Sequence, residues 1–179
     1  MTEEDIIRGS VKGDNSCQRI LFEKYAGRMM SLCLRYTKDE HAAQDILQLG
    51  FIRVFDHIHQ YKYEGSFEGW MKRVFISVAL RQISKKKPDF REMNEAMQEA
   101  WYEAPVAVSK ISEDELHAMI RKLPDGYRAV FNLVVLEGYS HEEVAGLLKI
   151  SSSTSRTQLL KARKMLQALI SKCFNIVMI

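Results

Sequence analysis

Apolar residues recur every three to four positions along nearly the whole chain, the spacing that places them on one face of an α-helix. Proline occurs only three times, at Pro88, Pro105 and Pro124, and each lies beside a break in this spacing. The alternation of apolar and polar residues that marks a half-buried β-strand does not appear. The sequence therefore predicts an all-α fold.

The first ninety residues contain three predicted helices. Asp14, Asp39 and Ser66 can each cap the start of one, because their side-chain oxygens can accept hydrogen bonds from the first helical turn. Amphipathic helices bury their apolar faces against one another, so we expect a compact helical bundle. The residues expected to face its core are Ile20, Leu21, Tyr25, Met29 and Leu32, then Ala43, Ile46, Leu47, Val54, Phe55 and Ile58, then Phe67, Trp70, Met71, Val74, Phe75, Val78 and Ala79.

Residues 91–110 lose the helical spacing and combine Pro105 with acidic and small residues. We expect a flexible linker there, partly helical at best. The sequence thus predicts two small helical domains, residues 1–90 and residues 111–179, joined by this linker.

The second domain contains four predicted helices. Two of them begin at a capping box, in which a serine is followed three residues later by a glutamate. Residues 124–126, Pro-Asp-Gly, predict a turn. The boundary residues are Ser112 with Glu115, Gly138, Ser140 with Glu143, and Ser151 at the start of the last helix. The residues expected to face inward before the last helix are Leu116, Met119, Ile120, Leu123, Tyr127, Val130, Phe131, Val134, Val144, Leu147 and Leu148.

The net charge of +3 is small, but basic and acidic residues are separated along the chain. Residues 72–87 hold six basic residues and residues 149–164 hold five, and neither range holds an acid. Between them, residues 92–115 hold seven acids and one lysine. This pattern is typical of two modules that face a polyanion, and equally of solvated helix faces that have no partner.

Chemistry-bearing residues form no recognisable catalytic or metal site. Cys17, Cys33 and Cys173 share no metal-ligand spacing and are odd in number, so we expect reduced thiols in a cytoplasmic protein. The five histidines have no carboxylate or thiol constellation, and no phosphate-binding glycine loop occurs. The N-terminus lacks the apolar core of a signal peptide, and the apolar tail, residues 173–179, is too short to span a bilayer. We expect no enzymatic activity, no cofactor and no small-molecule substrate.

Residues 140–166 have the layout of a helix-turn-helix, with about two turns of helix, a three-residue corner and a second helix. In the second helix, Ser155, Leu159, Ala162 and Leu166 form a stripe of small and apolar residues at steps of four, three and four. The opposite face is polar and basic. Helices that enter the major groove need this division, with short polar side chains near the N-terminus for base edges and basic ones for phosphates.

The sequence predicts distinct roles on that outer face. Arg156 can form two hydrogen bonds with a guanine, Thr157 can bond a base edge and Leu160 can contact a thymine methyl group. Lys161 and Lys164 can pair with phosphates, which positions the helix without reading sequence. The candidate contacts to an upstream element are Ser140, Ser153, Arg156, Thr157, Leu160, Lys161 and Lys164.

Lys149 stands in the corner between these two helices. Such corners often use glycine to reach a left-handed backbone conformation, and another residue there costs roughly 1 kcal/mol. The sequence leaves two possibilities open. Either the corner has another geometry, or packing by Ile150 tolerates the strain.

Two segments of the chain resemble extracytoplasmic-function (ECF) sigma factors of the sigma-70 family. LPDGYRAVFNLVVLEGYSHEEVAGLLKISSSTSRTQLLKARKML resembles their region four, which binds promoters. LFEKYAGRMMSLCLRYTKDEHAAQDILQLGFIRVF and FEGWMKRVFISVALRQI resemble their region two. The resemblance covers nearly the whole chain in the family's order, with a linker where the family has one. It implies a promoter-specificity subunit of bacterial RNA polymerase.

The resemblance also implies partners. In the family, the helix containing DILQLGFIRVF docks on the clamp helices of the largest subunit of core RNA polymerase. The flap region of the polymerase is a further expected contact. The polar matches for clamp docking are Asp45, Gln48 and Arg53. Many members are inhibited by an anti-sigma factor, often anchored in the inner membrane, so we expect such a partner and a cytoplasmic protein held at that membrane through it.

The family melts the downstream promoter element and captures unstacked bases beside the tryptophan helix. Such capture needs aromatic surfaces for bases and cations for the backbone. The candidates here are Tyr61, Lys62, Tyr63, Phe67, Lys72, Arg73, Ser77 and Arg81. For Trp70 and Phe75, which lie on the predicted inner stripe, core packing is the favoured interpretation.

Several positions depart from the family pattern, and these departures keep alternatives open. A glutamate usually follows the glutamine at position 48, where this chain has Leu49 and Gly50, and a glycine inside a helix costs about 1 kcal/mol. Ser77 replaces a common asparagine, and Ser153 replaces a glycine found in many relatives. The alternatives are a stand-alone helix-turn-helix regulator, a degenerate sigma-like protein that binds polymerase or a partner without initiating, and a plain helical interaction protein.

Overall fold

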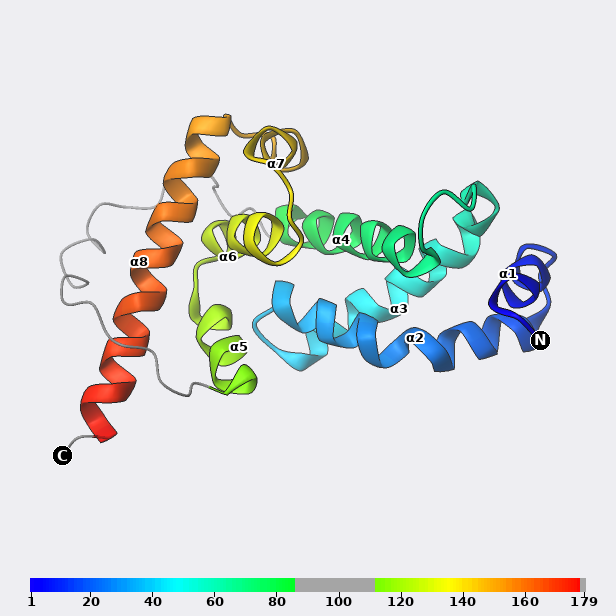
Figure 1. Cartoon of the computed structure of the whole chain (residues 1–179), viewed down its shortest axis with the longest axis horizontal. Coiled ribbons are helices and arrows are strands. Elements are labelled where there is room, and N and C mark those ends of the chain that lie inside the picture. The colour runs from blue at the N-terminus through cyan, green and yellow to red at the C-terminus, as the bar shows by residue number, and fades with distance from the viewer. Residues whose placement is uncertain (86–111, 178–179) are drawn as a thin grey trace. The chain divides into compact units, whose positions relative to one another are not determined.

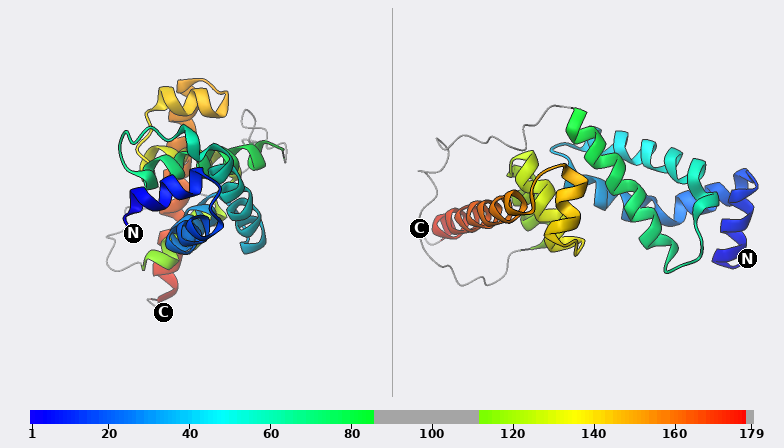
Figure 2. Two further views of the ribbon diagram at one scale, coloured as in Figure 1. Left: turned by 90° about the vertical axis from the view of Figure 1, so that its right-hand side faces the viewer. Right: turned by 90° about the horizontal axis from the view of Figure 1, so that it is seen from above.

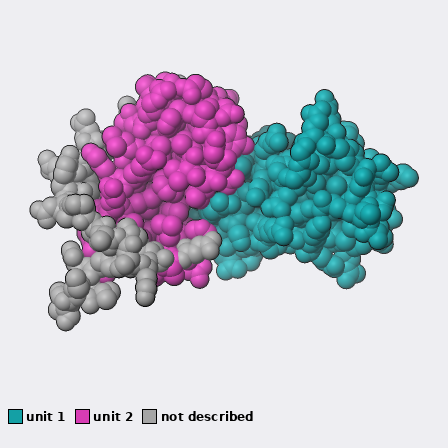
Figure 3. Space-filling view, in the orientation of Figure 1, with its two compact units in different colours: residues 1–82 teal, residues 83–179 magenta. Residues whose placement is uncertain are grey.

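The computed structural model describes residues 1–85 and 112–177, and every regular element in these ranges is helical (Figure 1). The all-α prediction is therefore confirmed for the described residues. The chain divides into two units, residues 1–82 and residues 83–179 (Figure 3). The linker expected at residues 91–110 lies outside the described residues.

The three helices predicted in the first unit start at the predicted caps. Asp14 accepts hydrogen bonds from the N–H groups of Ser16 and Cys17, Asp39 accepts one from Ala42, and the Ser66 hydroxyl accepts one from Gly69. Helices α2 and α3 run side by side (Figure 2). The elements are α1 (Glu3–Val11), α2 (Asn15–Tyr36), α3 (Glu40–His57), the 3-10 helix η1 (Ile58–Gln60) and α4 (Phe67–Lys85), which extends past residue 82.

Sequence reasoning missed α1. Its start carries a capping box, in which the Thr2 hydroxyl accepts from the N–H of Asp5 and the Asp5 carboxylate accepts from the N–H of Thr2. Its apolar residues Ile6 and Ile7 are buried. The signal was present in the sequence, because a threonine followed three residues later by an acid marks a helix start.

The core of the first unit follows the predicted stripes with a few exceptions. Ile20, Leu47, Phe55, Trp70 and Val74 were expected inside and are only half-buried. Conversely, the core contains residues that the stripes did not include. These are Cys17, Cys33, Tyr36, Gly50, Phe51, Ile76 and Leu80.

Gly50 is required by the packing of α3 against α4. A Cβ atom at this position would lie 2.2 Å from Cε1 of Phe75, closer than any real carbon contact. The Phe75 ring is fully buried and meets Phe51 edge-on, with ring centroids 5.3 Å apart. Gly50 carries the conformational penalty of a mid-helix glycine, but it also lets α3 approach Phe75 more closely than a residue with a Cβ atom would allow.

The second unit is also helical. The Ser112–Glu115 and Ser140–Glu143 capping boxes form as predicted, and the Ser151 hydroxyl accepts from the N–H of Thr154. The elements are α5 (Glu113–Lys122), α6 (Asp125–Phe131), the π-helical segment η3 (Asn132–Leu136), α7 (His141–Leu148) and α8 (Ser152–Val177).

Two expectations for the second unit were wrong, the turn at residues 124–126 and part of the inward-facing set, and one element was missed. Asp125 and Gly126 belong to the first turn of α6 and not to a turn, because Pro124 lies at the N-cap position, where its missing N–H is not needed. Helix α6 continues into the π-helical η3, which the apolar spacing does not reveal. Leu147 was expected inside but is 43% exposed, and Leu116 and Val134 are only half-buried.

We predict opposite effects for alanine at two helical glycines. Gly50→Ala should lower the free energy of unfolding by about 1–3 kcal/mol, because Phe75 must move to accept a methyl group. Gly27→Ala in α2 is the matched control, since nothing lies within 4 Å of its Cβ position. It should raise stability by about 0.5–1 kcal/mol. Urea denaturation followed by circular dichroism measures both, and equal stabilities would contradict the packing role of Gly50.

Candidate nucleic-acid and polymerase interfaces

Helix α8 has one buried face and one exposed polar face, as predicted. Ser155, Leu159, Ala162 and Leu166 are all buried, with exposures from 0% to 6%. On the other side, Ser153, Arg156, Thr157, Leu160 and Lys164 are exposed, and Lys161 is half-buried. Leu160 is 56% exposed on this face. The helix therefore presents hydroxyl, guanidinium, methyl and ammonium groups on one surface.

Two side-chain pairs join the first turn of α7 to α8. Nδ1 of His141 lies 2.8 Å from the buried Ser155 hydroxyl. Nη2 of Arg156 donates to Oε1 of Glu142 at 2.8 Å, and Nη1 donates to the Ser152 hydroxyl at 3.4 Å. Both members of the ion pair are more than half exposed, so it contributes little to stability. Its effect is to orient the Arg156 guanidinium on the exposed face.

Other candidate residues of this surface have local hydrogen bonds. The Ser140 hydroxyl accepts from the N–H of Glu143 as a cap, and the Thr157 hydroxyl donates to the Ser153 carbonyl oxygen. The Ser140 N–H donates to the Glu143 carboxylate, and these bonds lower the pKa of Glu143. Both hydroxyls remain on exposed residues.

Lys149 adopts the left-handed conformation, with φ 54° and ψ 44°. The possibility of another corner geometry is therefore excluded. The N–H groups of Lys149 and Ile150 both donate to the Ala145 carbonyl oxygen, which closes α7. Ile150 is only half-buried.

In the first unit, an aromatic cluster forms between η1 and the start of α4. The Tyr61 ring lies 4.9 Å from that of Tyr63 and 5.8 Å from that of Trp70, measured between centroids. The Tyr61 hydroxyl donates to the Gly65 carbonyl oxygen at 2.7 Å, and partial burial raises the pKa of this phenol. Tyr63 is 47% exposed and has a positive φ of 61°. The cluster thus presents the exposed Tyr63 beside the Tyr61 ring, which itself contacts Trp70.

Two residues of this cluster differ from their expected roles. Phe67 was expected both to face the core and to contact bases, and at 1% exposure its ring lies in the core, stacked 5.6 Å from Trp70. Trp70 was expected in the core but is half-buried beside Tyr61. Helical spacing places both residues on one stripe. The Tyr61 ring from the preceding loop contacts both of them, but Phe67 is more fully buried than Trp70.

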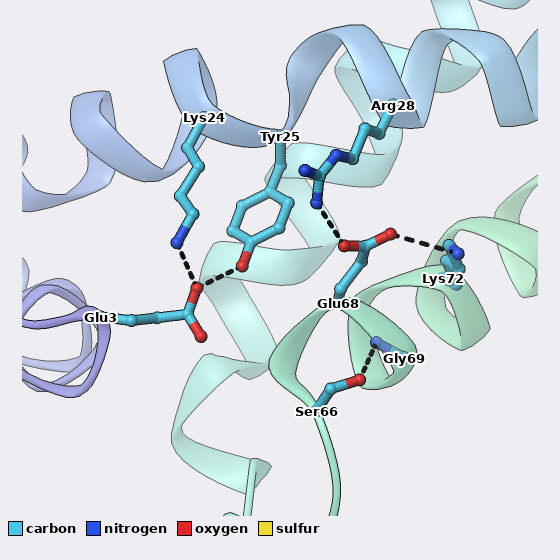
Figure 4. Close-up of polar contacts among 8 residues, drawn as sticks. All are labelled: Glu3, Lys24, Tyr25, Arg28, Ser66, Glu68, Gly69 and Lys72. Carbon is cyan, nitrogen blue, oxygen red and sulfur yellow. Dashed lines mark hydrogen bonds and ion pairs between the residues drawn. The ribbon is translucent and has the colours of Figure 1, made fainter.

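The basic candidates of α4 divide into two groups. Arg73, Ser77 and Arg81 are exposed and spaced by four, so they line one face of the helix, and Lys62 is exposed in the preceding loop. Lys72 is half-buried and lies 3.2 Å from the Glu68 carboxylate. The same carboxylate accepts from Nη1 of Arg28 at 2.5 Å, as Figure 4 shows. The charge of Lys72 is therefore shared with an acid.

Glu68 links α2 to the first turn of α4. Partial burial raises the pKa of this carboxyl group, but the hydrogen bonds from Lys72 and Arg28 outweigh burial and hold the pKa below its ordinary value. Figure 4 also shows Glu3 of α1 between Lys24 and Tyr25 of α2. Acids that lie outside α2 thus tie two helices to it.

The candidate polymerase contacts Asp45, Gln48 and Arg53 are all exposed on α3. Sequence reasoning missed their apolar neighbours Leu49 and Ile52, which are 39% and 50% exposed. Positions 45, 48, 49 and 52 follow the i, i+3, i+4, i+7 spacing of one helix face. Because this chain has Leu49 where the family usually has a glutamate, the sequence could have indicated an apolar contact surface here.

Within residues 1–85 and 112–177, no group of three or more histidine, cysteine or acidic side chains could hold a metal ion. Burial raises the pKa of the Cys33 thiol to about 12, so this thiol stays protonated near neutral pH. None of the described helices is both long and apolar enough to cross a membrane.

Both halves of the chain match models of one protein family. The sigma-70 region 2 model matches residues 21–89, and the sigma-70 region 4 model matches residues 113–166. The chain belongs to the ECF RNA polymerase sigma factors of the sigma-70 family. In this sigma factor, the aromatic cluster and α3 lie within the region 2 match, and α7 with most of α8 lies within the region 4 match.

Curated relatives match this sigma factor over most of its length. The ECF RNA polymerase sigma factor SigW of Bacillus subtilis is 29% identical over 87% of this chain and 90% of its own. SigM of the same organism is 27% identical over 87% and 96%. Among solved structures, the sigma factor RpoE of Bartonella quintana, in complex with the anti-sigma factor NepR, covers 86% of this chain with a TM-score of 0.55 and 13% identity. That likeness supports the fold.

The Glu68 network predicts a pH-dependent stability difference. Glu68→Gln should lower the free energy of unfolding at pH 7 by about 0.5–1 kcal/mol, because two partly exposed ion pairs are lost. Since the folded pKa of Glu68 is depressed, its contribution is present above the ordinary carboxyl pKa and is lost as pH falls through the folded value. The difference between variant and wild type should therefore disappear in acid.

Glu64→Gln is the matched control, because Glu64 is an exposed acid of the same unit with the same charge. It should leave stability unchanged at both pH values. Denaturant unfolding at pH 7 and near pH 3 measures each difference. A Glu68→Gln difference that persists in acid would contradict the ionic origin of the contribution.

Proposed function

We propose that this sigma factor reads an upstream promoter element with α8, captures unstacked bases at the Tyr61–Tyr63 surface, and docks on core RNA polymerase through α3. The observation that carries the proposal is the division of α8. Its small residues are buried against the unit, while Arg156, Thr157 and Leu160 are exposed together near its start. A groove-reading helix needs this arrangement of base-reading groups.

The proposed strand-opening surface combines stacking and charge. Tyr63 is 47% exposed and its ring packs beside that of Tyr61, which in turn contacts the Trp70 ring. Aromatic rings of this kind stack on unpaired bases with little sequence preference. The exposed stripe of Arg73, Ser77 and Arg81 supplies cations for the strand backbone. We assign Phe67 a supporting role behind Trp70.

The proposed polymerase contact is both polar and apolar. Asp45 and Gln48 share one exposed face of α3 with Leu49 and Ile52. Exposed apolar side chains rimmed by polar ones are typical of protein–protein contacts. We propose that Leu49 replaces a lost polar contact with apolar burial on the clamp helices, and that the flap region meets the second unit.

We propose a non-catalytic role, in which binding interactions within the holoenzyme supply the free energy for promoter melting. An anti-sigma factor is a further proposed partner, supported by the solved complex of the Bartonella quintana sigma factor with NepR. On this proposal the protein is cytoplasmic and is held at the inner membrane when that partner is anchored there.

The decisive experiment is transcription in vitro with purified core RNA polymerase and the promoter region of the chain's own gene. We expect a stable complex with core polymerase and transcripts from a defined start. A stand-alone regulator would bind the DNA without core polymerase. A degenerate sigma-like protein would bind core polymerase without producing transcripts, and a chain that forms no complex with core would refute the proposal.

A comparison of Arg156 and Lys161 tests the reading role of α8. Arg156→Ala should cost about 1–3 kcal/mol at one upstream base pair and relax specificity there. Lys161→Ala should weaken binding equally on all sequences and flatten its salt dependence. Holoenzyme affinities for single-base promoter variants measure both. If Arg156→Ala weakens binding equally on all sequences, Arg156 contacts a phosphate.

A further inference from the structure

The corner between α7 and α8 has Lys149 in a left-handed backbone conformation that glycine would adopt without strain. Of the five positive-φ residues in the described ranges, Gly13, Gly65 and Gly138 are glycines, and Tyr63 and Lys149 are not. A non-glycine residue in the left-handed region is strained, because its Cβ approaches the following carbonyl oxygen. Such strain gathers at functional sites, where the side chain has a use that offsets it.

The fold itself makes little use of the Lys149 side chain. The residue is exposed, and within residues 1–85 and 112–177 no hydrogen bond or ion pair of its ammonium group is recorded. The backbone bonds that close α7 would form equally well with glycine. A lysine after the last turn of α7 can interact favourably with the carbonyl end of that helix, and this local effect is the competing explanation.

The position of Lys149 favours a partner outside the chain. It lies two residues before Ser151, which caps α8, and Figure 1 shows the corner leading directly into the start of that helix. Ser153 and Arg156 follow on the exposed face. When the start of a helix enters the major groove, phosphates flank the groove beside it, within reach of a lysine on the adjoining corner.

We propose that Lys149 is a phosphate contact of the promoter complex, and that the strain of its backbone is retained for this contact. The inference rests on the proposed reading role of α8 and adds a residue to that interface. A lysine is a point charge that carries no base readout, so the contact strengthens binding equally on all sequences. Lys149 then adds a sequence-independent contact to the proposed base readout by Arg156.

Three substitutions separate charge from strain. Lys149→Gly removes both, Lys149→Gln removes the charge and keeps the strain, and Lys149→Arg keeps both. One phosphate contact changes the slope of log affinity against log salt by about 0.9, which corresponds to about eightfold in affinity at 0.1 M salt. Relief of left-handed strain should raise the melting temperature of the second unit by several degrees.

The experiment uses holoenzyme reconstituted with core RNA polymerase and a duplex that the wild-type holoenzyme selects from random sequences. Salt titrations of binding are paired with thermal melts of the free chain. We expect Lys149→Gly to melt higher than wild type yet bind about eightfold more weakly with a flatter slope. Lys149→Gln should bind as weakly without the gain in melting temperature, and Lys149→Arg should match wild type in binding.

Two outcomes overturn the inference alone. Either Lys149→Gly and Lys149→Gln bind with the affinity and salt slope of wild type, or the loss falls on only one base pair of the selected duplex. In the first case Lys149 serves only the end of α7. If the wild-type holoenzyme itself selects no duplex, the proposed function fails, and the two failures are thereby distinguished.

Discussion

The helices of this chain are stabilised mainly by burying their apolar stripes against one another, because most of the stability of a helix in a protein comes from packing and not from intrinsic propensity. Each of the two units contains one such core, with fully buried residues such as Leu21 and Met71 in the first unit and Leu123 and Leu133 in the second. Helices α3, α4 and α8 each pack one face against a core and leave the opposite face exposed. The exposed faces of α3, α4 and α8 carry the proposed contacts for this reason, and their chemistry can vary without altering the fold.

Polar groups inside the second unit fix the turn between α5 and α6. The Arg128 guanidinium is 2% exposed and donates to the carbonyl oxygens of Arg121 and Leu123 and to the Asp125 carboxylate. Burial lowers the pKa of Arg128, and the neighbouring Asp125 opposes this effect. An arginine remains charged in such a site, and it satisfies carbonyl groups at the end of α5 that have no partner within the helix. The direction in which α6 leaves α5 is thereby set, and α6 in turn packs against α8.

Local sequence signals predicted most of the boundaries and the exposed face of α8. Caps depend on residues three positions apart, and the stripe from Ser155 to Leu166 depends on helical spacing, so both can be read without knowledge of the tertiary structure. The assignment of rings was less successful. Trp70 and Phe67 share one helical stripe, but the loop carrying Tyr61 covers them unequally, and a stripe contains no information about a loop. Helical spacing also gave the wrong side for Leu147 and did not reveal the π-helical η3, since both depend on how the helices of the unit pack.

The sequence by itself determined the helical class, the helix starts and the division of α8 into a buried and a basic face, because these follow from interactions within a few residues along the chain. The tertiary structure decided the meaning of Gly50, which departs from the family pattern, and of Lys149, whose corner geometry the sequence left open. Gly50 looked like a destabilising substitution, but the approach of Phe75 from α4 leaves no room for a Cβ atom. Lys149 allowed two corner geometries until the hydrogen bonds to the Ala145 carbonyl oxygen fixed it in the left-handed region. Both outcomes depend on atoms brought together by packing or chain reversal, which helical spacing does not encode.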